Sequence, residues 1–295
     1  MVNGILNVNK EKGYTSHDVV AKLRGIIGQR KIGHTGTLDP DATGVLPVCL
    51  GKATKLCDLL TDKNKEYEAT LLLGVETDTQ DTTGTVMCKA ETKDITEAQV
   101  RECVAEFIGK YNQIPPMYSA LKVEGKKLYE LAREGKTIER KAREVHIYVA
   151  EILSIDLPRV YLKVKCSKGT YIRTLCHDIG RKLQCGGCME ELVRTRVGTF
   201  ELQNAMKLDE IEKCKHLGGI EDELMPVDEI FKEYKQIHLH GENMKRVYNG
   251  NSFSSAKVQC QDGEIIRIYN EQAEFVALYR YEENKNNFKA WKMFL

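Results

Sequence analysis

An aspartate in a polar, glycine-rich segment is the strongest candidate for chemistry in this sequence. Residues 33–40 read Gly-His-Thr-Gly-Thr-Leu-Asp-Pro, which places the carboxylate at Asp39. The glycines allow the backbone to approach a ligand closely, and Pro40 restricts Asp39 to an extended conformation. A rigidly held, ionised carboxylate could act as a nucleophile or as a general base. The alternative role is a turn-capping aspartate, which is common.

The same segment also matches a phosphatase motif. Residues 39–43 read Asp-Pro-Asp-Ala-Thr, which fits the Asp-x-Asp-x-Thr nucleophile motif of haloacid-dehalogenase-like phosphatases. That motif requires a buried hydrophobic strand of a parallel sheet directly before the first aspartate. Residues 32–37, Ile-Gly-His-Thr-Gly-Thr, are unsuited to such a strand. An aspartyl phosphatase therefore remains the weaker alternative.

The elements around this loop follow from local signals. Residues 5–8 favour a short strand, and a capping signal at 15–18 begins a helix whose apolar residues repeat at helical spacing up to Gly28. Residues 45–50 are an apolar stretch, a second helix is indicated over 53–60, and residues 67–75 read as a strand.

Further helices and strands alternate irregularly after residue 90. Thr96 and Gln99 form a capping box for a helix expected to carry apolar residues up to Ile108 on one face, and a short helix over 126–134 should stop at Gly135. Residues 145–155 and 160–166 alternate like two strands of one sheet, followed by a helix from about residue 172. This order predicts the α+β class with a mixed or antiparallel sheet.

The pattern of apolar and polar residues changes after residue 226. From about 234 onward, short alternating segments are separated by turn signals at Asn249-Gly250 and Asp262-Gly263. The sequence therefore predicts a catalytic domain over residues 1–230 and a small β-rich domain over residues 234–295.

Composition sets limits on the partners and the location of the protein. Its 295 residues carry a net charge of +1, so affinity for nucleic acid must come from a locally basic surface. The first 16 residues lack the apolar core of a signal peptide, and no apolar run approaches the roughly 18 residues of a membrane span. We therefore expect a cytoplasmic protein with its ten cysteines reduced. Cys185 and Cys188 have the spacing of a zinc-binding pair, but no second such pair exists, and we expect no metal.

Three segments carry a resemblance to a known family. These segments are residues 33–51, residues 115–122 (Pro-Pro-Met-Tyr-Ser-Ala-Leu-Lys) and residues 166–174 (Cys-Ser-Lys-Gly-Thr-Tyr-Ile-Arg-Thr). They closely resemble the signatures of TruB-type pseudouridine synthases and occur in the same order. The resemblance covers roughly residues 5–200. One departure is Lys10-Glu11-Lys12-Gly13, where the family usually has a proline after the lysine; we expect a slightly looser turn there.

The resemblance implies an activity and roles for six residues. The reaction would convert uridine 55 in the T loop of tRNA to pseudouridine, without a cofactor because it involves no net redox change or hydrolysis. Asp39 would be the catalytic aspartate, with Arg173 as its partner. The other implied site residues line the base pocket or enter the RNA loop: Tyr67 as the stacking tyrosine, Tyr171, Leu192 and His34.

The target base must be flipped out of a folded loop, so the resemblance also implies contacts to RNA phosphates and sugars. Residues 159–196 hold nine Lys/Arg against three Asp/Glu, and residues 121–146 hold eight against five, which favours an RNA groove near these segments. Residues 234–295 weakly resemble a PUA-like domain that would grip the acceptor-stem side of tRNA. The remaining alternative is a T-arm binding or folding factor without catalysis. Nothing in the sequence demands an oligomer, so we expect a monomer.

Overall fold

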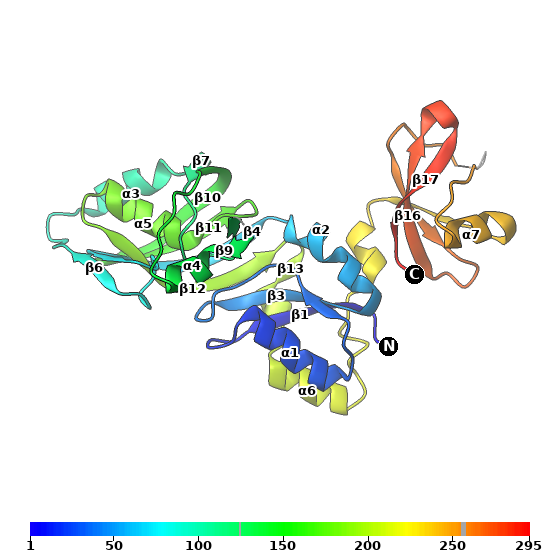
Figure 1. Cartoon of the computed structure of the whole chain (residues 1–295), viewed down its shortest axis with the longest axis horizontal. Coiled ribbons are helices and arrows are strands. Elements are labelled where there is room, and N and C mark those ends of the chain that lie inside the picture. Colours follow the sequence, from blue (N-terminus) through cyan, green and yellow to red (C-terminus); the bar gives the residue numbers. More distant parts are fainter. Residues whose placement is uncertain (124, 255–257) are drawn as a thin grey trace.

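A nine-stranded mixed sheet organises most of the chain (Figure 1). The computed structural model describes residues 1–123, 125–254 and 258–295. The strand order along the sheet is β1-β3-β12-β4-β11-β10-β7, with β2 paired to β3 and β13 paired to β12. The bounds of these strands are β1 Gly4–Lys10, β2 Ile32–His34, β3 Thr43–Leu50, β4 Lys65–Leu73, β7 Gly109–Gln113, β10 Arg143–Asp156, β11 Arg159–Cys166, β12 Gly187–Val197 and β13 Phe200–Glu201.

One short parallel contact joins the two halves of this sheet. Strands β12 and β3 are parallel over two residue pairs, Val193 with Thr43 and Arg194 with Gly44, whereas the other pairings of the sheet are antiparallel. The segment between β2 and β3, which contains Asp39, therefore lies where the two half-sheets meet. The mixed sheet with helices confirms the α+β class.

Helices α1 (Ser16–Ile27) and α6 (Leu208–His216) pack on the half-sheet built by β1 and β3. Thr15 caps α1 through a reciprocal box with Asp18, and Gly28 ends the helix in a left-handed conformation, as the local signals predicted. The short helices η1 (Gly51–Leu56) and α2 (Cys57–Thr61) follow β3 and replace the single helix that the sequence indicated.

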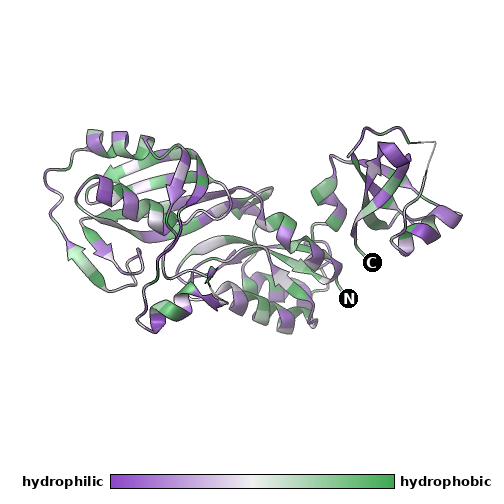
Figure 2. Cartoon of the chain, turned by 45° about the horizontal axis from the view of Figure 1, so that its top comes forward, coloured by the Kyte–Doolittle hydropathy of each residue, from purple (hydrophilic) through white to green (hydrophobic). Residues whose placement is uncertain are grey.

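Helices α3 (Glu97–Ala105) and α5 (Ile172–Lys182) cover the other half-sheet. The capping box of α3 is present, but the helix ends at Ala105, so Phe107 and Ile108 lie beyond it and Ile108 is half exposed. The prediction of a helix through Ile108 was wrong because the chain must turn there to enter β7. Figure 2 shows hydrophobic and hydrophilic residues interspersed along the strands and helices of this lobe.

Two small hairpins and one short helix flank this lobe. The hairpins are β5 (Val75–Thr77) with β6 (Val86–Lys89) and β8 (Lys122–Val123) with β9 (Lys126–Lys127). Helix α4 (Leu128–Arg133) follows β9, and Gly135 adopts a positive φ after it, as predicted.

The last part of the chain forms its own four-stranded sheet in the order β14-β15-β16-β17. Its elements are β14 Lys235–His238, α7 Gly241–Tyr248, β15 Ile265–Tyr269, β16 Phe275–Glu282, η4 Glu283–Lys285 and β17 Asn287–Met293. This confirms a β-rich C-terminal domain. The turn at Asn249-Gly250 ends helix α7 rather than joining two strands, which corrects the expectation of strands alone over this stretch.

One buried cluster connects the C-terminal domain to the half-sheet of β1 and β3. Leu278 and Phe294 share a buried cluster with Ile5 and Val45, and Phe231 of η3 (Val227–Phe231) completes it. The remaining short helix, η2 (Leu202–Asn204), follows β13. Among the described residues, no helix is long and apolar enough to cross a membrane. All ten cysteines are free.

Candidate active site

The loop that carries Asp39 is held by contacts on both sides of the aspartate. The Leu38 amide donates a 2.9 Å hydrogen bond to Ser16 Oγ at the start of α1. On the other side of Asp39, the Pro40 carbonyl accepts from the Lys10 ammonium at 2.9 Å and from the Gly13 amide at 3.0 Å. These bonds fix the backbone on either side of Asp39 and leave its side chain free to point across the junction of the half-sheets.

Lys10 is the buried cation of this loop, and sequence reasoning did not single it out. Its Nζ also donates to the carbonyls of Glu11 (3.1 Å) and Tyr14 (2.6 Å), so three carbonyl oxygens surround one ammonium group. Burial lowers the pKa of Lys10 to about 8, which the charge of Asp39 opposes. The three acceptors use all three N–H bonds, so only the ammonium form satisfies them. These contacts hold residues 10–14, the segment that lacks the usual proline of the family, against the Asp39 loop.

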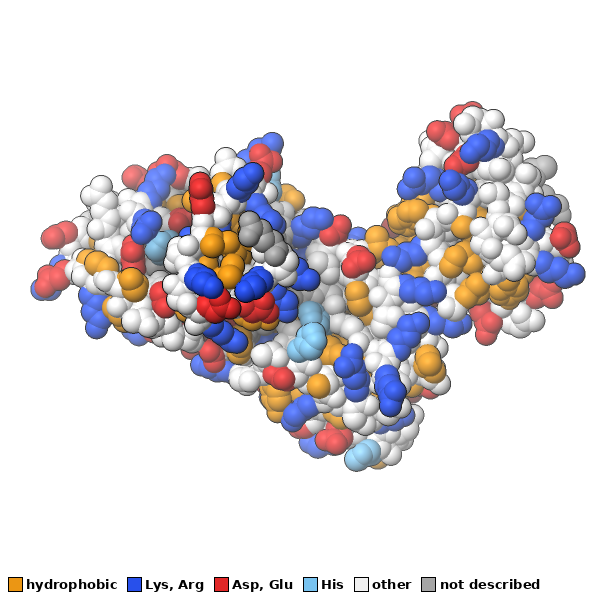
Figure 3. Space-filling model, in the orientation of Figure 1, with side chains coloured by type: hydrophobic (Ala, Val, Ile, Leu, Met, Phe, Trp, Pro, Cys, Tyr) orange, Lys and Arg blue, Asp and Glu red, His pale blue; other side chains and the backbone are white. Residues whose placement is uncertain are grey.

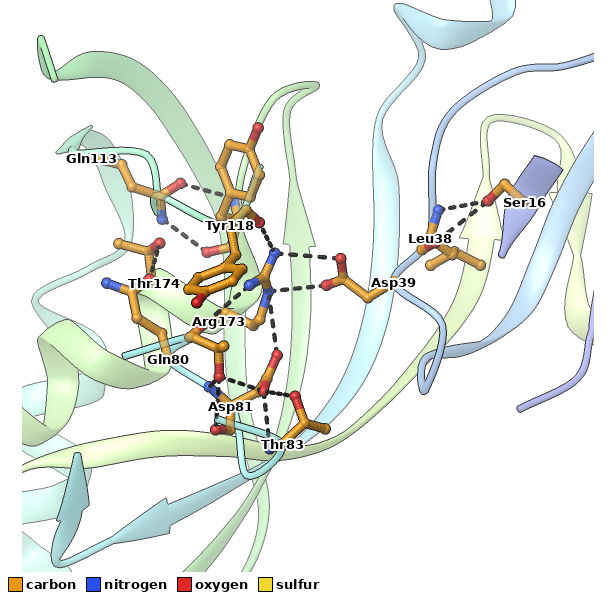
Figure 4. Close-up of polar contacts among 12 residues, drawn as sticks. Ser16, Leu38, Asp39, Gln80, Asp81, Thr83, Gln113, Tyr118, Arg173 and Thr174 are labelled. Carbon is orange, nitrogen blue, oxygen red and sulfur yellow. Dashed lines mark hydrogen bonds and ion pairs between the residues drawn. The ribbon is translucent and has the colours of Figure 1, made fainter. Parts of the chain in front are cut away.

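Asp39 faces Arg173 across the junction (Figure 4). Its two carboxylate oxygens are 2.9 Å from Nε and 3.3 Å from Nη2 of the arginine, a two-point contact that fixes the plane of the carboxylate. The Asp39 side chain is 39% exposed whereas that of Arg173 is 5% exposed. The structure therefore brings the predicted pair together, with the carboxylate open to an incoming group and the arginine buried behind it.

Backbone carbonyls hold Arg173 from the other side. Nη1 donates to the Thr79 carbonyl at 2.9 Å and Nη2 to the Tyr118 carbonyl at 2.8 Å. Arg173 lies in the first turn of α5, so its guanidinium connects that helix to two loops and to Asp39. Its orientation is thereby set before any substrate is present.

A second carboxylate, Asp81, shares Arg173 with Asp39. Its Oδ2 lies 3.7 Å from Arg173 Nε, and its side chain is 15% exposed. Its Oδ1 accepts from the Thr83 amide (3.0 Å), the Thr83 hydroxyl (2.6 Å) and the Thr79 hydroxyl (2.7 Å). Sequence reasoning missed Asp81 because the segment 77–84 has the composition of an ordinary polar turn.

Two apolar or aromatic site residues occupy neighbouring strands. Tyr67 of β4 and Leu192 of β12 are each 8% exposed and belong to the buried cluster that also contains Leu38. Burial raises the pKa of Tyr67 to about 12, so its hydroxyl is neutral. These two side chains provide an apolar wall beside the Asp39 loop.

Tyr171 lies immediately before α5 and is anchored by a side chain from another strand. Gln113, at the end of β7, donates to the Tyr171 carbonyl (2.9 Å) and accepts from the Tyr171 amide (2.8 Å). Burial raises the pKa of Tyr171 above its ordinary value. Gln113 carried no sequence signal, because its role depends on the packing of β7 against the start of α5.

His34 ends β2 and stands at the edge of the same loop. Its Nδ1 accepts a 3.3 Å hydrogen bond from the Gly36 amide, and its ring meets the edge of His17 at a centroid distance of 6.0 Å. Burial lowers the pKa of His34, and the charges of His17 and Arg194 add to that effect. The imidazole is therefore neutral near neutral pH.

The basic run 159–196 does not form a free cationic surface. Seven of its nine lysines and arginines are ion-paired with carboxylates from other elements, as in Arg159 with Glu190 and Lys165 with Glu66. Arg194, another member of the run, is fully buried. The sequence count overestimated the free charge of this run because six of the seven paired acids lie outside it in the sequence.

Cys185 does not point to a metal site. Its thiol contacts the carbonyls of Gly180 (3.8 Å) and Gly186 (3.4 Å). Within the described part of the chain, no group of three or more His, Cys, Asp or Glu side chains could hold a metal ion. The Asp-x-Asp-x-Thr context of a phosphatase is also missing, since Asp39 precedes strand β3 instead of ending a buried parallel strand.

Comparisons with known proteins agree with this geometry. Residues 24–172 match the family model described as TruB family pseudouridylate synthase (N terminal domain), and residues 173–232 match the tRNA pseudouridylate synthase B C-terminal domain. The chain is 53% identical to tRNA pseudouridine synthase B of Lachnoclostridium phytofermentans over the full length of both chains. It is 45% identical to the protein of that name from Clostridium novyi, covering 94% of this chain and 95% of the relative.

Solved structures give the same result. The chain from the crystal structure of a Cbf5-Nop10-Gar1 complex is 27% identical, with a TM-score of 0.72, over 99% of this chain and 85% of that one. A chain from an H/ACA RNP bound to a substrate RNA containing 2′-deoxyuridine is 25% identical, with a TM-score of 0.71 and the same coverage. Fold and site thus define an enzyme of the pseudouridine synthase class. Within that class, the chain belongs to the TruB family.

Proposed function

We propose that this chain converts the uridine at position 55 in the T loop of tRNA to pseudouridine, with Asp39 as the catalytic carboxylate. The observation that carries the proposal is the Asp39–Arg173 pair, in which a buried, fully anchored arginine orients a carboxylate that remains open to an incoming nucleotide. The names of the relatives, tRNA pseudouridine synthase B, support tRNA as the substrate.

The reaction breaks the bond between uracil N1 and C1′, turns the base, and forms a bond between C5 and C1′. The proton lost from C5 is balanced by the proton gained at N1, so the product is an isomer of the substrate. An ionised Asp39 serves either route to this exchange, by attacking the nucleotide or by removing the 2′ proton. Arg173 holds the carboxylate in a fixed plane through its two-point contact.

The target uridine must leave the RNA stack before it can reach Asp39, at a cost of a few kcal/mol. Tyr67 and Leu192 supply an apolar wall for the flipped base, and Tyr171, two residues before Arg173 and within reach of its charge, supplies a second aromatic ring. His34, neutral and partly exposed at the loop edge, would fill the space that the base leaves in the RNA.

RNA contacts beyond the base come from the surface around the site. Figure 3 shows lysine and arginine side chains gathered along the hollow between the catalytic lobe and the C-terminal domain. Phosphate contacts of this kind would offset the cost of base flipping and weaken as salt rises. We assign residues 234–295 as a PUA-like domain that binds the acceptor-stem side of tRNA. We also propose that the chain is a monomer. Light scattering with and without tRNA tests the oligomeric state.

The decisive experiment is to incubate the purified protein with an unmodified tRNA transcript and to map pseudouridine by position. Asp39→Asn should abolish the product and leave tRNA affinity within about threefold, because the amide is isosteric but cannot act as a base. Asp41→Asn is the matched control, since Asp41 is exposed and lies only two residues away. Product at another position would correct the substrate site.

Three results would contradict the proposed chemistry. Product from the Asp39→Asn variant would exclude the assigned role of Asp39. Tight tRNA binding without product by the wild-type protein would identify a binding or folding factor. Release of phosphate from a phosphoester with Mg²⁺, dependent on Asp39, would revive the phosphatase alternative.

A further inference from the structure

Arg194 is a fully buried cation at the centre of the site, and the proposed chemistry gives it no role. It lies on β12 with 2% of its surface exposed, the largest of the fully buried side chains. No ion pair joins it to a carboxylate among the residues that the structure describes. Burying a charge without a counter-ion is costly, so the contacts that hold this guanidinium indicate what it does.

Those contacts bracket the loop that carries Asp39. Nε donates a 2.7 Å hydrogen bond to the Val45 carbonyl, and Nη2 donates a 3.3 Å bond to the Gly36 carbonyl. Gly36 lies three residues before Asp39 and Val45 lies six residues after it. One rigid, planar side chain therefore holds both ends of the catalytic loop at a fixed separation.

The same guanidinium also reaches the wall of the base pocket. Tyr67 and Arg194 are direct partners on the adjacent strands β4 and β12, and the positive charge of Arg194 acts on the Tyr67 hydroxyl by opposing the rise of its pKa. On its other side, Arg194 pairs with Gly44 of β3 in the short parallel contact. A Cβ at Gly44 would lie 2.3 Å from the Arg194 carbonyl oxygen, so the glycine is what lets β3 and β12 approach this closely.

We propose that Arg194 is a positioning residue that couples Tyr67 to the Asp39 loop and so sets the separation between the aromatic ring and the carboxylate. The inference rests on the proposed function in one respect, which is that the uracil lies between these two groups. A lysine at this position would keep the charge, but its single nitrogen could not donate to the Val45 and Gly36 carbonyls from one rigid plane beside Tyr67. Loss of the planar guanidinium should therefore misplace Asp39 relative to the base without removing any group that touches RNA.

The test compares Arg194→Lys, Tyr67→Phe and the double variant in single-turnover assays at saturating tRNA, together with tRNA affinity. Arg194→Lys should slow the chemical step on the order of 10- to 100-fold, the cost of a displacement of about 1 Å, while tRNA affinity stays within about threefold. If the two residues act as one unit, the double variant should be no slower than Arg194→Lys alone. A purely stabilising role would lower the melting temperature without this split between rate and affinity.

Arg196→Lys is the matched control, because Arg196 lies two residues along the same strand, is half-exposed, and pairs with Glu201; it should keep the wild-type rate. A wild-type rate for Arg194→Lys, or additive effects in the double variant, overturns the inference. If Arg194→Lys does not fold, Tyr67→Phe decides alone, since it removes only the hydroxyl, and an unchanged rate overturns the coupling. A wild-type protein that forms no pseudouridine overturns the proposed function and this inference with it.

Discussion

Replacing Arg173 by lysine tests the orientation of the proposed catalytic carboxylate of Asp39. The guanidinium makes a two-point contact with Asp39 at 2.9 and 3.3 Å and donates to the carbonyls of Thr79 and Tyr118 at 2.9 and 2.8 Å. An ammonium group keeps the charge but has one nitrogen, so it cannot reach both carboxylate oxygens and both carbonyls. The carboxylate then rotates, and at least one partly buried carbonyl loses its donor.

The magnitudes follow from these contacts. Loss of an orienting, charge-assisted contact at a reacting group costs roughly 3–4 kcal/mol in the chemical step, which is a fall of about 10²- to 10³-fold in rate. A buried carbonyl left without a donor costs about 1–3 kcal/mol, so each of these partly buried carbonyls should lower the free energy of unfolding by about 1 kcal/mol, the low end of that range. Because Arg173 is buried behind Asp39, away from the incoming RNA, tRNA affinity should change by less than about threefold.

Single-turnover pseudouridine formation at saturating tRNA measures the first quantity, urea unfolding the second, and filter binding the third. Arg181→Lys is a suitable control, because Arg181 lies on the same helix, is well exposed, and pairs with Glu76. The reasoning fails if Arg173→Lys loses affinity in proportion to activity, since that would make the arginine a phosphate contact instead of an orienting group. It also fails if the rate stays within a few fold of wild type.

Three further predictions follow from the same structure. Because the pKa of His34 is lowered in the folded state, the unfolded state binds the proton first as pH falls through about 6.5. Acidification from pH 7 to 5.5 should therefore lower the melting temperature more for wild type than for His34→Asn. An equal fall in melting temperature for both proteins would contradict the lowered pKa. Gly44→Ala should destabilise by at least about 2–4 kcal/mol in urea unfolding, because its methyl group would collide with the Arg194 carbonyl, whereas Gly13→Ala, which has open space, should cost only about 1 kcal/mol for its positive φ. Chelator treatment should leave the rate of pseudouridine formation unchanged and elemental analysis should find no stoichiometric zinc, since residues 185–188 bring no third ligand; one zinc per chain, lost together with activity, would refute this.

The first helix, the two long strands of the sheet and the loop were readable from the sequence because their signals are local. The capping box at Thr15, the alternation over residues 145–155 and 160–166, and the glycine–proline pattern around Asp39 each act within a few residues. The resemblance of three ordered segments added the family and the candidate residues. Where local signals compete with packing, the predictions were wrong: the end of α3 was placed too late, and helix α7 was not expected.

Tertiary structure alone decided which side chains meet. Arg173 reaches Asp39 across 134 residues, and Asp81 joins them from a turn with no distinguishing composition. In the sequence, Arg194 is one more member of a basic run, yet the two-residue parallel contact between β12 and β3 buries it against the loop that carries Asp39. Strand order and burial are properties of the whole chain: the free energy of a buried charge depends on partners that no local window of sequence contains.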